Sequence, residues 1–491
     1  MIASIPRPPV DWFAISPSLV LLGVAGLCLM VAVLVPQAGR RATAAILTLG
    51  GFVGAFVAAA LVYDRTPVGH SVIADAVRRD RFFALGAMIV AVAGLVAVLV
   101  SYDERTDEHV AEYYALLAAA GAGMMFLVQA NNLMTLFLGL EWFSISLYIL
   151  CAIDFRRERS LEAGLMYLIV GGFGSAVLLF GSALVYGATG TLTFQGIAES
   201  VTANGLSHDT LLLIGLAMII VGLGFKASAA PFHMWTPDVY EGAPTSVTGF
   251  MAAATKVAAL LLALRILNTA FPQEARLWTI AVAVLACASL AIGNLAALVQ
   301  RNIKRLLAYS SISHAGFMLI AIAAHNSLGE RALLFYLIPY AAMSIGAFAV
   351  VAARERELGK PVTIDNLAGM GWERPLLGAA MWTFMLGFAG LPPTGGFLGK
   401  FYVFSAAYRH GWLWLVIVGI AATAVSLYYY LAVIRALYMR PSAELQFAAG
   451  GSPPRDLLLQ IGVLLCMLVT VGTFFGVQPL IDLAHHAVAG L

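Results

Sequence analysis

The chain has 491 residues, of which 61% are hydrophobic and 11% are charged, and its mean hydropathy is +0.90. Soluble domains usually carry about 25% charged residues, so this composition excludes a soluble protein and predicts an integral membrane protein. The formal net charge of +2, without a basic tract, excludes nucleic-acid binding. The cysteines are scattered singly and predict neither a zinc site nor an iron–sulfur site; they are Cys28, Cys151, Cys287 and Cys466.

Apolar runs of about 18 or more residues are long enough to cross a bilayer as helices. We predict fourteen such helices, of which two are broken. They lie near residues 15–35, 43–63, 82–101, 111–130, 132–152, 161–187, 210–240 (interrupted), 246–265, 276–299, 303–324, 331–353, 375–408 (interrupted), 411–438 and 456–476. The loops between them are too short for a separate soluble domain. Residues 1–491 are therefore expected to form one all-α polytopic membrane domain, with a short tail before a retained first helix.

The Lys and Arg residues of the short loops indicate the orientation, because cytoplasmic loops carry an excess of both. Nine of these residues lie on the side of the amino terminus, and fifteen lie on the opposite side. The sequence therefore predicts that both termini lie outside the cytoplasm.

The polar residues of the predicted helices follow a pattern that repeats. Glu141 lies in a continuous helix, and Lys226 lies 85 residues later in a broken helix. His314 and Lys400 are arranged in the same way, 86 residues apart. The repeating unit contains five helices, which is an odd number, so equivalent helices of the two repeats must run in opposite directions. Many transporters have this inverted arrangement, with broken helices at their binding sites. The two inverted five-helix repeats are predicted at residues 111–265 and 276–438.

Lysine is the basic residue expected deep in the membrane. Of 23 arginines and five lysines, the bases placed deep in apolar helices are Lys226, Lys256 and Lys400. An arginine stays protonated at any accessible pH, whereas a lysine taken out of water can release its proton. These three lysines are therefore predicted to carry protons. The alternative is that they extend to an interface or form structural ion pairs.

Glu141 stands alone among apolar residues near the middle of the fifth predicted helix. Desolvation favours the neutral form of its carboxyl group, and a nearby lysine favours the charged form. If Lys226 is that lysine, the pair can act as a switch in which the lysine keeps its proton while the pair is closed. A static ion pair is the alternative, and the sequence leaves the contact itself open.

Two proline-rich stretches interrupt helices, PFHMWTPD from Pro231 and LPPTGG at 391–396. They free backbone groups at membrane depth, where such groups are tolerated only if they are buried in protein or line a wet cavity. An ordinary proline kink explains one break more easily than two breaks that each lie beside a lysine. The sequence therefore predicts that both breaks belong to an ion path.

Two histidines and a fourth lysine are further candidates. Imidazole titrates near neutrality, so His314 is a candidate proton relay, whereas His233 is more simply a satisfied core residue. Lys304, in the stretch RNIKR at 301–305, is interpreted as an anchor at the cytoplasmic side. A role for Lys304 in proton uptake is the second choice.

Three stretches resemble the antiporter-like membrane subunits of respiratory complex I, a family related to the Mrp-type sodium/proton antiporters. They are GFKASAAPFHMWTPDVYEGAP at 224–244, NIKRLLAYSSISHAGF at 302–317 and GLPPTGGFLGKFYVF at 390–404. The resemblance implies fourteen helices with two inverted repeats. It places the family's functional residues at Glu141, Lys226, Lys256 and Lys400. Two features restrict the resemblance to one type of subunit within this family. They are the lysine at position 400 and the end of the chain about fifteen residues after the last predicted helix.

The same resemblance implies proton translocation driven by redox chemistry on partner subunits. It implies that this chain binds no cofactor or metal, and that NADH, FMN, iron–sulfur clusters and quinone are bound by those partners. The expected partners are other membrane subunits of complex I, including neighbouring antiporter-like subunits, within the lipid bilayer. The expected location is the bacterial inner membrane, with both termini on the periplasmic side. A subunit of an Mrp-type cation/proton antiporter is the alternative function.

Overall fold

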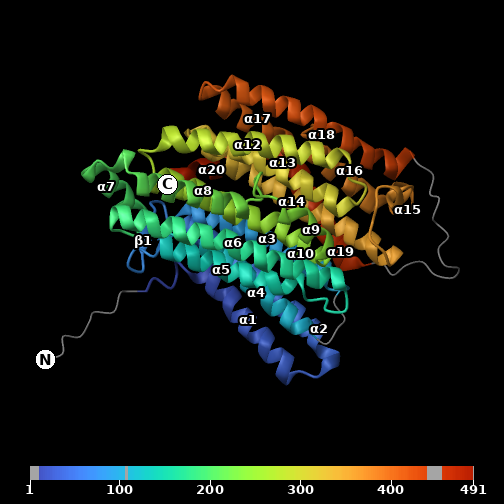
Figure 1. Cartoon of the computed structure of the whole chain (residues 1–491). Coiled ribbons are helices and arrows are strands. Elements are labelled where there is room, and N and C mark those ends of the chain that lie inside the picture. Colours follow the sequence, from blue (N-terminus) through green and yellow to red (C-terminus); the bar gives the residue numbers. More distant parts are fainter. Residues whose placement is uncertain (1–9, 105–108, 440–455, 490–491) are drawn as a thin grey trace.

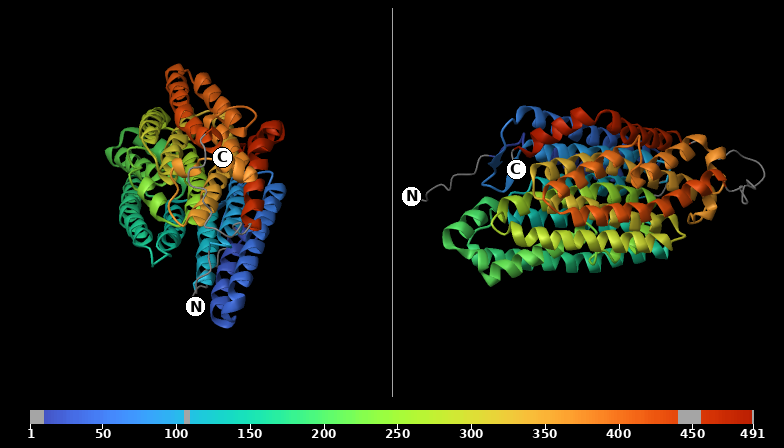
Figure 2. Two further views of the ribbon diagram at one scale, coloured as in Figure 1. Left: turned by 90° about the vertical axis from the view of Figure 1, so that its right-hand side faces the viewer. Right: turned by 90° about the horizontal axis from the view of Figure 1, so that it is seen from above.

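The computed structural model describes residues 10–104, 109–439 and 456–489. Its long helices are aligned roughly along one common axis (Figures 1 and 2). Within these ranges, twelve helical segments are long and apolar enough to span a membrane. They are α1 (Ser16–Leu34), α2 (Gln37–Arg65), α3 (Arg81–Ser101), α4 (Val110–Val128), α5 (Leu133–Cys151), α6 (Glu158–Thr189), the continuous unit of α10 (Thr245–Phe250), η2 (Met251–Thr255) and α11 (Lys256–Ala270), α12 (Ala275–Leu298), α13 (Ile303–Ala323), α14 (Ser327–Leu358), α18 (Leu413–Met439) and α19 (Leu457–Phe475).

Two shorter apolar helices end at interruptions. They are α8 (Thr210–Lys226) and α16 (Pro375–Ala389), which are followed after the breaks by α9 (Trp235–Gly242) and α17 (Gly395–Arg409). Each break contains one cis peptide bond, at Ala230–Pro231 and at Pro392–Pro393. The prediction of an all-α polytopic membrane protein with two broken helices is confirmed. The number of fourteen crossings and the inverted repeat stay predictions.

The other elements are short and lie outside the long helices. They are the hairpin strands β1 (His70–Val72) and β2 (Val77–Arg79), the helices α7 (Phe194–Asn204), α15 (Met370–Glu373) and α20 (Val477–Val488), and the 3-10 turns η1 (Leu206–His208) and η3 (Asp365–Leu367). The antiparallel hairpin between α2 and α3 was not expected from the sequence. Its strands pair three residues each, which is too short for a hydrophobic alternation to be visible in the sequence.

The long helices divide into an inner and an outer set. The unit α10–η2–α11 and helices α13 and α14 bury nearly all of their residues, and helices α3 and α4 bury most of theirs. The outer helices expose large hydrophobic side chains, such as Ile46 on α2, Phe173 on α6 and Ile417 on α18. Figure 1 shows α1 and α2 on one flank of the bundle and α17 and α18 on the opposite flank. Because Lys256 and His314 lie on inner helices, the surrounding helices shield them from lipid.

Several helices begin at a side-chain cap, which satisfies backbone N–H groups that have no partner within the helix. Asn132 accepts a hydrogen bond from the Thr135 amide at 2.7 Å at the start of α5. Asn302 does the same for the Lys304 amide at 2.8 Å at the start of α13. These caps fix the residues at which α5 and α13 begin, and thereby the depth at which their polar side chains lie.

Gly396, in the first turn of α17, lies where the second broken helix comes closest to its own first half. A Cβ atom at this position would lie 2.0 Å from the carbonyl oxygen of Gly387 on α16, so the backbone would have to shift. We expect Gly396→Ala to reduce stability by about 3 kcal/mol, measured as a lower melting temperature of the detergent-solubilised protein. Gly472→Ala is the control, because no atom lies within 4 Å of a Cβ there. Equal melting temperatures would contradict this account.

Candidate functional site

Lys226 is the last residue of α8 and is only 3% exposed. Its Nζ donates a hydrogen bond to Oγ of Ser144 on α5 at 2.8 Å. The ring centroids of Phe143 and Tyr148 lie 5.5 and 5.6 Å from the same nitrogen. The ring faces stabilise a cation, yet the described residues offer this ammonium no carboxylate within 4.0 Å. The surroundings therefore suit a group that gains and loses a proton.

Glu141 lies on α5, three residues before Ser144. Its Oε1 is buried and has no hydrogen-bond partner among the described residues. The sequence suggested Glu141 as the neighbour of Lys226, but in the structure the hydroxyl group of Ser144 occupies that position. The same hydroxyl group donates to the carbonyl oxygen of Leu140. Glu141 and Lys226 therefore do not form an ion pair in this structure. Ser144 is the group that contacts the lysine.

Lys256 is fully buried and begins α11 directly after the π-helical turn η2. Its Nζ lies 3.5 Å from Oγ of Ser228, within the first break. Ser228 has a positive φ of 60° and comes two residues after Lys226. The break between α8 and α9 thus brings the hydroxyl group of Ser228 to Lys256. This arrangement places Lys226 and Lys256 on either side of the same interrupted segment.

His314 lies in the middle of α13 and contacts two tyrosines. Its Nδ1 lies 2.7 Å from the hydroxyl group of Tyr336 on α14, and its Nε2 lies 3.2 Å from that of Tyr430 on α18. A neutral imidazole donates from one nitrogen and accepts at the other. His314 can therefore pass a proton from one hydroxyl group to the other by exchanging its tautomers.

Tyr340 on α14 connects the region of Lys256 with the helix that carries His314. Its hydroxyl group lies 3.3 Å from the carbonyl oxygen of Ala252 in η2 and 3.1 Å from Oγ of Ser311 on α13. A π-helical turn displaces backbone carbonyls from the regular ladder, which makes the Ala252 oxygen accessible. Four pairs of polar groups therefore meet in the interior of the bundle. They are Ser144 with Lys226, Ser228 with Lys256, Ser311 with Tyr340, and His314 with Tyr430.

Lys400 lies on α17, after the second break, and is 4% exposed. Its Nζ donates to the carbonyl oxygens of Phe388 and Ala389 at 2.9 and 3.3 Å. These are the last two residues of α16, and terminal carbonyls carry the partial negative charge of the helix. The end of α16 therefore binds this ammonium in place of an acidic side chain.

The positions of Lys226 and Lys400 differ from the sequence-based expectation. Lys226 comes before its break, whereas Lys400 comes after its own break, so the two residues are not equivalent along the backbone. The side chain of Lys400 extends back across the break to the end of α16. Both ammonium groups consequently lie near the end of the first half of a broken helix.

His233 differs from the satisfied core residue that was the simpler interpretation. It is partly exposed in the first break, and its Nδ1 is buried without a partner among the described residues. The cysteines are unpaired, and no group of three or more His, Cys, Asp or Glu side chains suited to a metal ion occurs within the described ranges. Nδ1 of His233 is thus not hydrogen-bonded to any of the polar groups that surround the lysines.

Arg265 is a buried cation, although it is one of the nine Lys and Arg residues that the sequence assigns to short loops on the side of the amino terminus. It is 1% exposed and forms a bidentate ion pair with Asp80, at 2.6 and 3.0 Å. Asp80 also caps α3 by accepting from the Phe83 amide at 2.7 Å. The pair therefore joins the end of α11 to the start of α3.

Asp80 also pairs with Arg78 at 3.3 Å. Asp80→Asn separates the capping role of Asp80 from its ion pairs, because asparagine caps helices as well as aspartate does. The variant leaves the buried guanidinium of Arg265 without its carboxylate, and we expect a loss of about 3 kcal/mol. Thermal denaturation measures this loss. Asp209→Asn is the matched control, since Asp209 caps α8 through the Leu212 amide at 2.9 Å without an ion pair to Arg or Lys among the described residues. A melting temperature like that of the control would refute the assigned role of the ion pair.

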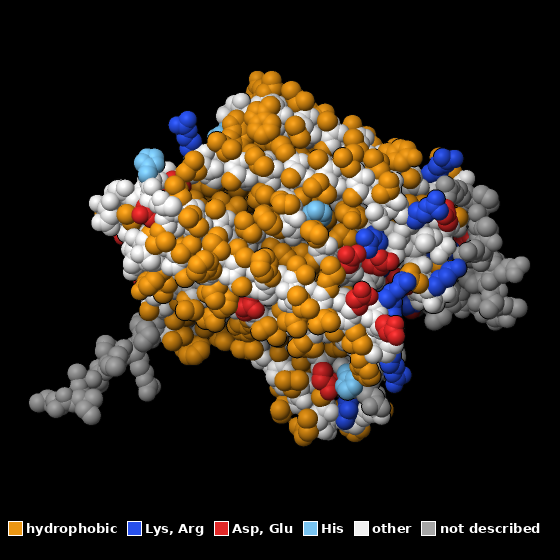
Figure 3. All heavy atoms as spheres, viewed as in Figure 1, with side chains coloured by type: hydrophobic (Ala, Val, Ile, Leu, Met, Phe, Trp, Pro, Cys, Tyr) orange, Lys and Arg blue, Asp and Glu red, His pale blue; other side chains and the backbone are white. Residues whose placement is uncertain are grey.

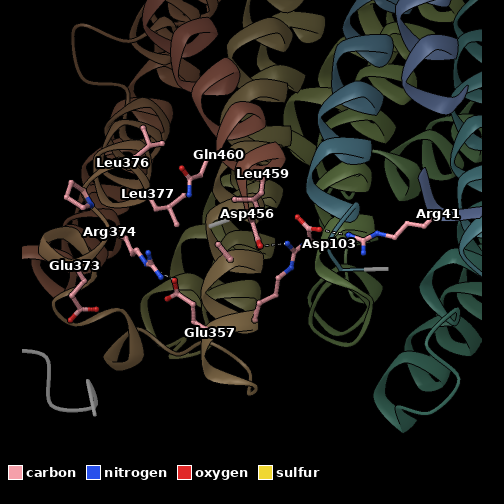
Figure 4. Close-up of a pocket in the computed structure, with 13 residues that line it drawn as sticks. Arg41, Asp103, Glu357, Glu373, Arg374, Leu376, Leu377, Asp456, Leu459 and Gln460 are labelled. Atoms are coloured by element: carbon pink, nitrogen blue, oxygen red, sulfur yellow. Dashed lines mark hydrogen bonds and ion pairs between the residues drawn. The ribbon is translucent and has the colours of Figure 1, made fainter. Parts of the chain in front are cut away.

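Charged side chains gather at one end of the bundle, while hydrophobic side chains cover the middle of the face in Figure 3. A pocket of about 620 Å³ at this end is lined by Arg41, Asp103, Arg356, Arg374 and Asp456, among others (Figure 4). Its arginines are occupied by carboxylates, as in the 2.6 Å contact between Arg356 and Asp456. This pocket is a network of ion pairs that holds helix ends together, and it is not the site of the buried lysines.

The fold and the buried lysines beside two helix breaks define the class of antiporter-like membrane subunits. Residues 130–426 match the family described as NADH:quinone oxidoreductase/Mrp antiporter, transmembrane. The chain belongs to this family. NADH-quinone oxidoreductase subunit N of Trichlorobacter lovleyi is 43% identical over 87% of this chain and 87% of its own length. Subunit N 2 of Roseiflexus castenholzii is 39% identical over 98% of this chain and 97% of its own length.

Solved structures show the same fold. A chain of respiratory complex I from Thermus thermophilus is 32% identical, with a TM-score of 0.79 over 96% of this chain and 99% of that chain. A chain of the Mrp complex from a Dietzia species reaches a TM-score of 0.85 at 23% identity, over 97% of each chain. At that identity the second likeness concerns the fold alone. Membership of a multi-subunit membrane complex follows from the family.

Proposed function

We propose that this chain is a proton-translocating membrane subunit of a bacterial NADH:quinone oxidoreductase, of the type called subunit N in its relatives. The observation that carries the proposal is the set of buried lysine and histidine side chains, hydrogen-bonded to hydroxyl groups, in a chain that is similar over nearly its whole length to a protein of that name. Lysine ammonium groups donate hydrogen bonds and cannot coordinate sodium. The transported ion is therefore the proton.

In this proposal, Lys226, Lys256 and Lys400 take up and release protons in turn. Glu141 biases Lys226 towards its charged form whenever the carboxylate replaces Ser144 as its neighbour. His314 relays between the regions of Lys256 and Lys400, because its ring packs against Tyr340 and against Phe388. Its two nitrogens exchange protons with the hydroxyl groups of Tyr336 and Tyr430. The energy comes from redox chemistry on partner subunits, which bind NADH, FMN, the iron–sulfur clusters and quinone.

The proposal includes two inverted repeats, residues 111–265 and 276–438. Two isolated backbone bridges support them, Asn132 with Thr193 and Asn302 with Thr363, since the members of the second lie 170 residues after those of the first. The excess of Lys and Arg at one end supports an inner-membrane orientation with both termini on the periplasmic side.

Copurification tests the proposal. Mild solubilisation of the native protein, followed by affinity capture of this chain, is expected to recover flavin, iron and NADH-dependent quinone reduction in the same complex. The alternative is an Mrp-type cation/proton antiporter subunit, which has the same fold. Recovery with other antiporter-like subunits alone, free of flavin and iron, would establish that alternative and refute the first proposal.

A further inference from the structure

Lys304 is a buried lysine that the path between Lys226 and Lys400 does not use. It lies in the first turn of α13 and is 2% exposed. Its Nζ donates to the carbonyl oxygen of Ala243 at 2.8 Å and to Oγ1 of Thr245 at 3.1 Å. An anchor at the membrane surface extends its ammonium into water, so the burial of Lys304 contradicts the interpretation as an anchor.

A carboxylate and an open pocket lie directly beyond this lysine. Oγ1 of Thr245 donates to Oε2 of Glu355 near the end of α14. Thr245 and Glu355 line a surface pocket of about 550 Å³ at the charged end of the bundle, together with Glu104, Arg157, Arg159 and Lys360. A continuous series of hydrogen bonds therefore runs from the buried ammonium to the pocket.

The same two helices lead from this pocket to the interior. Thr245 begins α10 and Lys304 lies at the start of α13, where the two side chains meet. Seven residues further along each helix lie Ala252 and Ser311, and both contact the hydroxyl group of Tyr340. Seven residues correspond to two helical turns, or about 10 Å. Both helices therefore lead from the pocket to the polar groups near Lys256, where Tyr340 on α14 contacts both of them.

We propose that Glu355, Thr245 and Lys304 form the proton entrance of this chain. Glu355 takes a proton from water in the pocket. Thr245 accepts that proton on its hydroxyl oxygen while its own hydroxyl proton passes to neutral Lys304. One proton is thereby moved from the pocket to Lys304, and Glu355 returns to its carboxylate form. The observed hydrogen bonds, from Lys304 to Thr245 and from Thr245 to Glu355, have the polarity of the loaded state.

This inference rests on the proposed function and adds the place where protons enter. The charged groups that face Lys304 are Glu355 on α14, Glu241 on α9, Glu104 after α3 and Arg157 before α6. A purely structural role is the competing account, in which Lys304 ties the end of α9 to α13 through Ala243. The two accounts differ in their response to external pH and in their tolerance of arginine.

The first test is made on the assembled complex in inverted membrane vesicles, where the pH on the pocket side can be set. We expect Thr245→Val to slow NADH-driven proton pumping about tenfold at pH 8, and to approach the wild-type rate at pH 6, because a higher proton concentration compensates a slow entrance. Glu355→Gln is expected to behave in the same way. Thr248→Val is the matched control, since among the described residues its hydroxyl group donates only to the backbone oxygens of Tyr240 and Pro244. An equal fractional loss at both pH values would overturn the proposal.

The second test replaces Lys304 itself. Lys304→Arg keeps the charge and the ability to donate hydrogen bonds, but a guanidinium does not release its proton. An entrance predicts that pumping falls at least tenfold in this variant, while a structural tie predicts recovery to near the wild-type rate. Lys226→Met, measured beside it, separates the two proposals. If Lys226→Met abolishes pumping and Lys304→Arg does not, the entrance is wrong and the proposed function stands; if neither variant changes pumping, the proposed function fails as well.

Discussion

Lys226→Met is expected to stop proton translocation through this chain while the complex still assembles. Methionine has nearly the length of lysine and fills the space between Phe143 and Tyr148 without a charge. Its thioether cannot take up a proton, so the step between Ser144 and Ser228 is lost. A positioned proton-transfer group contributes about 10²–10⁴-fold to a rate, and we expect a fall in NADH-driven pumping of about that size. Fluorescence quenching of a pH-sensitive dye in sealed vesicles measures it.

Lys226→Arg sharpens this prediction. It keeps a positive charge at the end of α8 but fixes the proton, so it should impair pumping nearly as much as Lys226→Met. Arg409→Met is the control for loss of a basic residue, because Arg409 is exposed at the end of α17. Full pumping in Lys226→Arg would mean that the charge, and not the proton, is what this position requires.

The broad fold could be predicted because the bilayer restricts the sequence strongly. A chain in hydrocarbon must satisfy its backbone groups internally, so long apolar runs identify helices, as they do for α3 and α13. Lysines remain conspicuous in such runs, and Lys226, Lys256 and Lys400 are all buried in the structure. Prolines and glycines likewise indicated both breaks. In each case a residue type that is energetically costly within a membrane helix is easily recognised in the sequence.

The partners of the lysines could not be predicted, because serine and tyrosine are common in membrane helices and carry little penalty there. Nothing in the sequence distinguishes Ser144, Ser228 and Tyr336 from other serines and tyrosines, although each contacts a lysine or His314. The two predicted repeats can also be aligned in more than one way. Aligned on their capping asparagines, α5 and α13 place Ser144, and not Glu141, opposite His314, since both pairs lie 170 residues apart. Only the three-dimensional contacts distinguish a regular spacing from an equivalent position.

Lys400→Glu is expected to be more damaging than Lys400→Met, although both remove the ammonium group. Nζ of Lys400 donates to the carbonyl oxygens of Phe388 and Ala389 at the end of α16. A glutamate there brings a carboxylate to acceptor oxygens at the negative end of a helix, where an anion is disfavoured. It is therefore forced into its neutral form or turned away from the break.

Both Lys400 variants should lower pumping by at least about tenfold, and Lys400→Glu should in addition lower the melting temperature, since an unsatisfied buried group costs about 1–3 kcal/mol. Arg409→Glu, nine residues later on the exposed end of α17, introduces the same carboxylate and should change neither quantity. Proton pumping and thermal denaturation of the four proteins, including the wild type, decide the matter. If Lys400→Glu pumps better than Lys400→Met, this position needs only a titratable group, and the carbonyls of α16 do not select its charge.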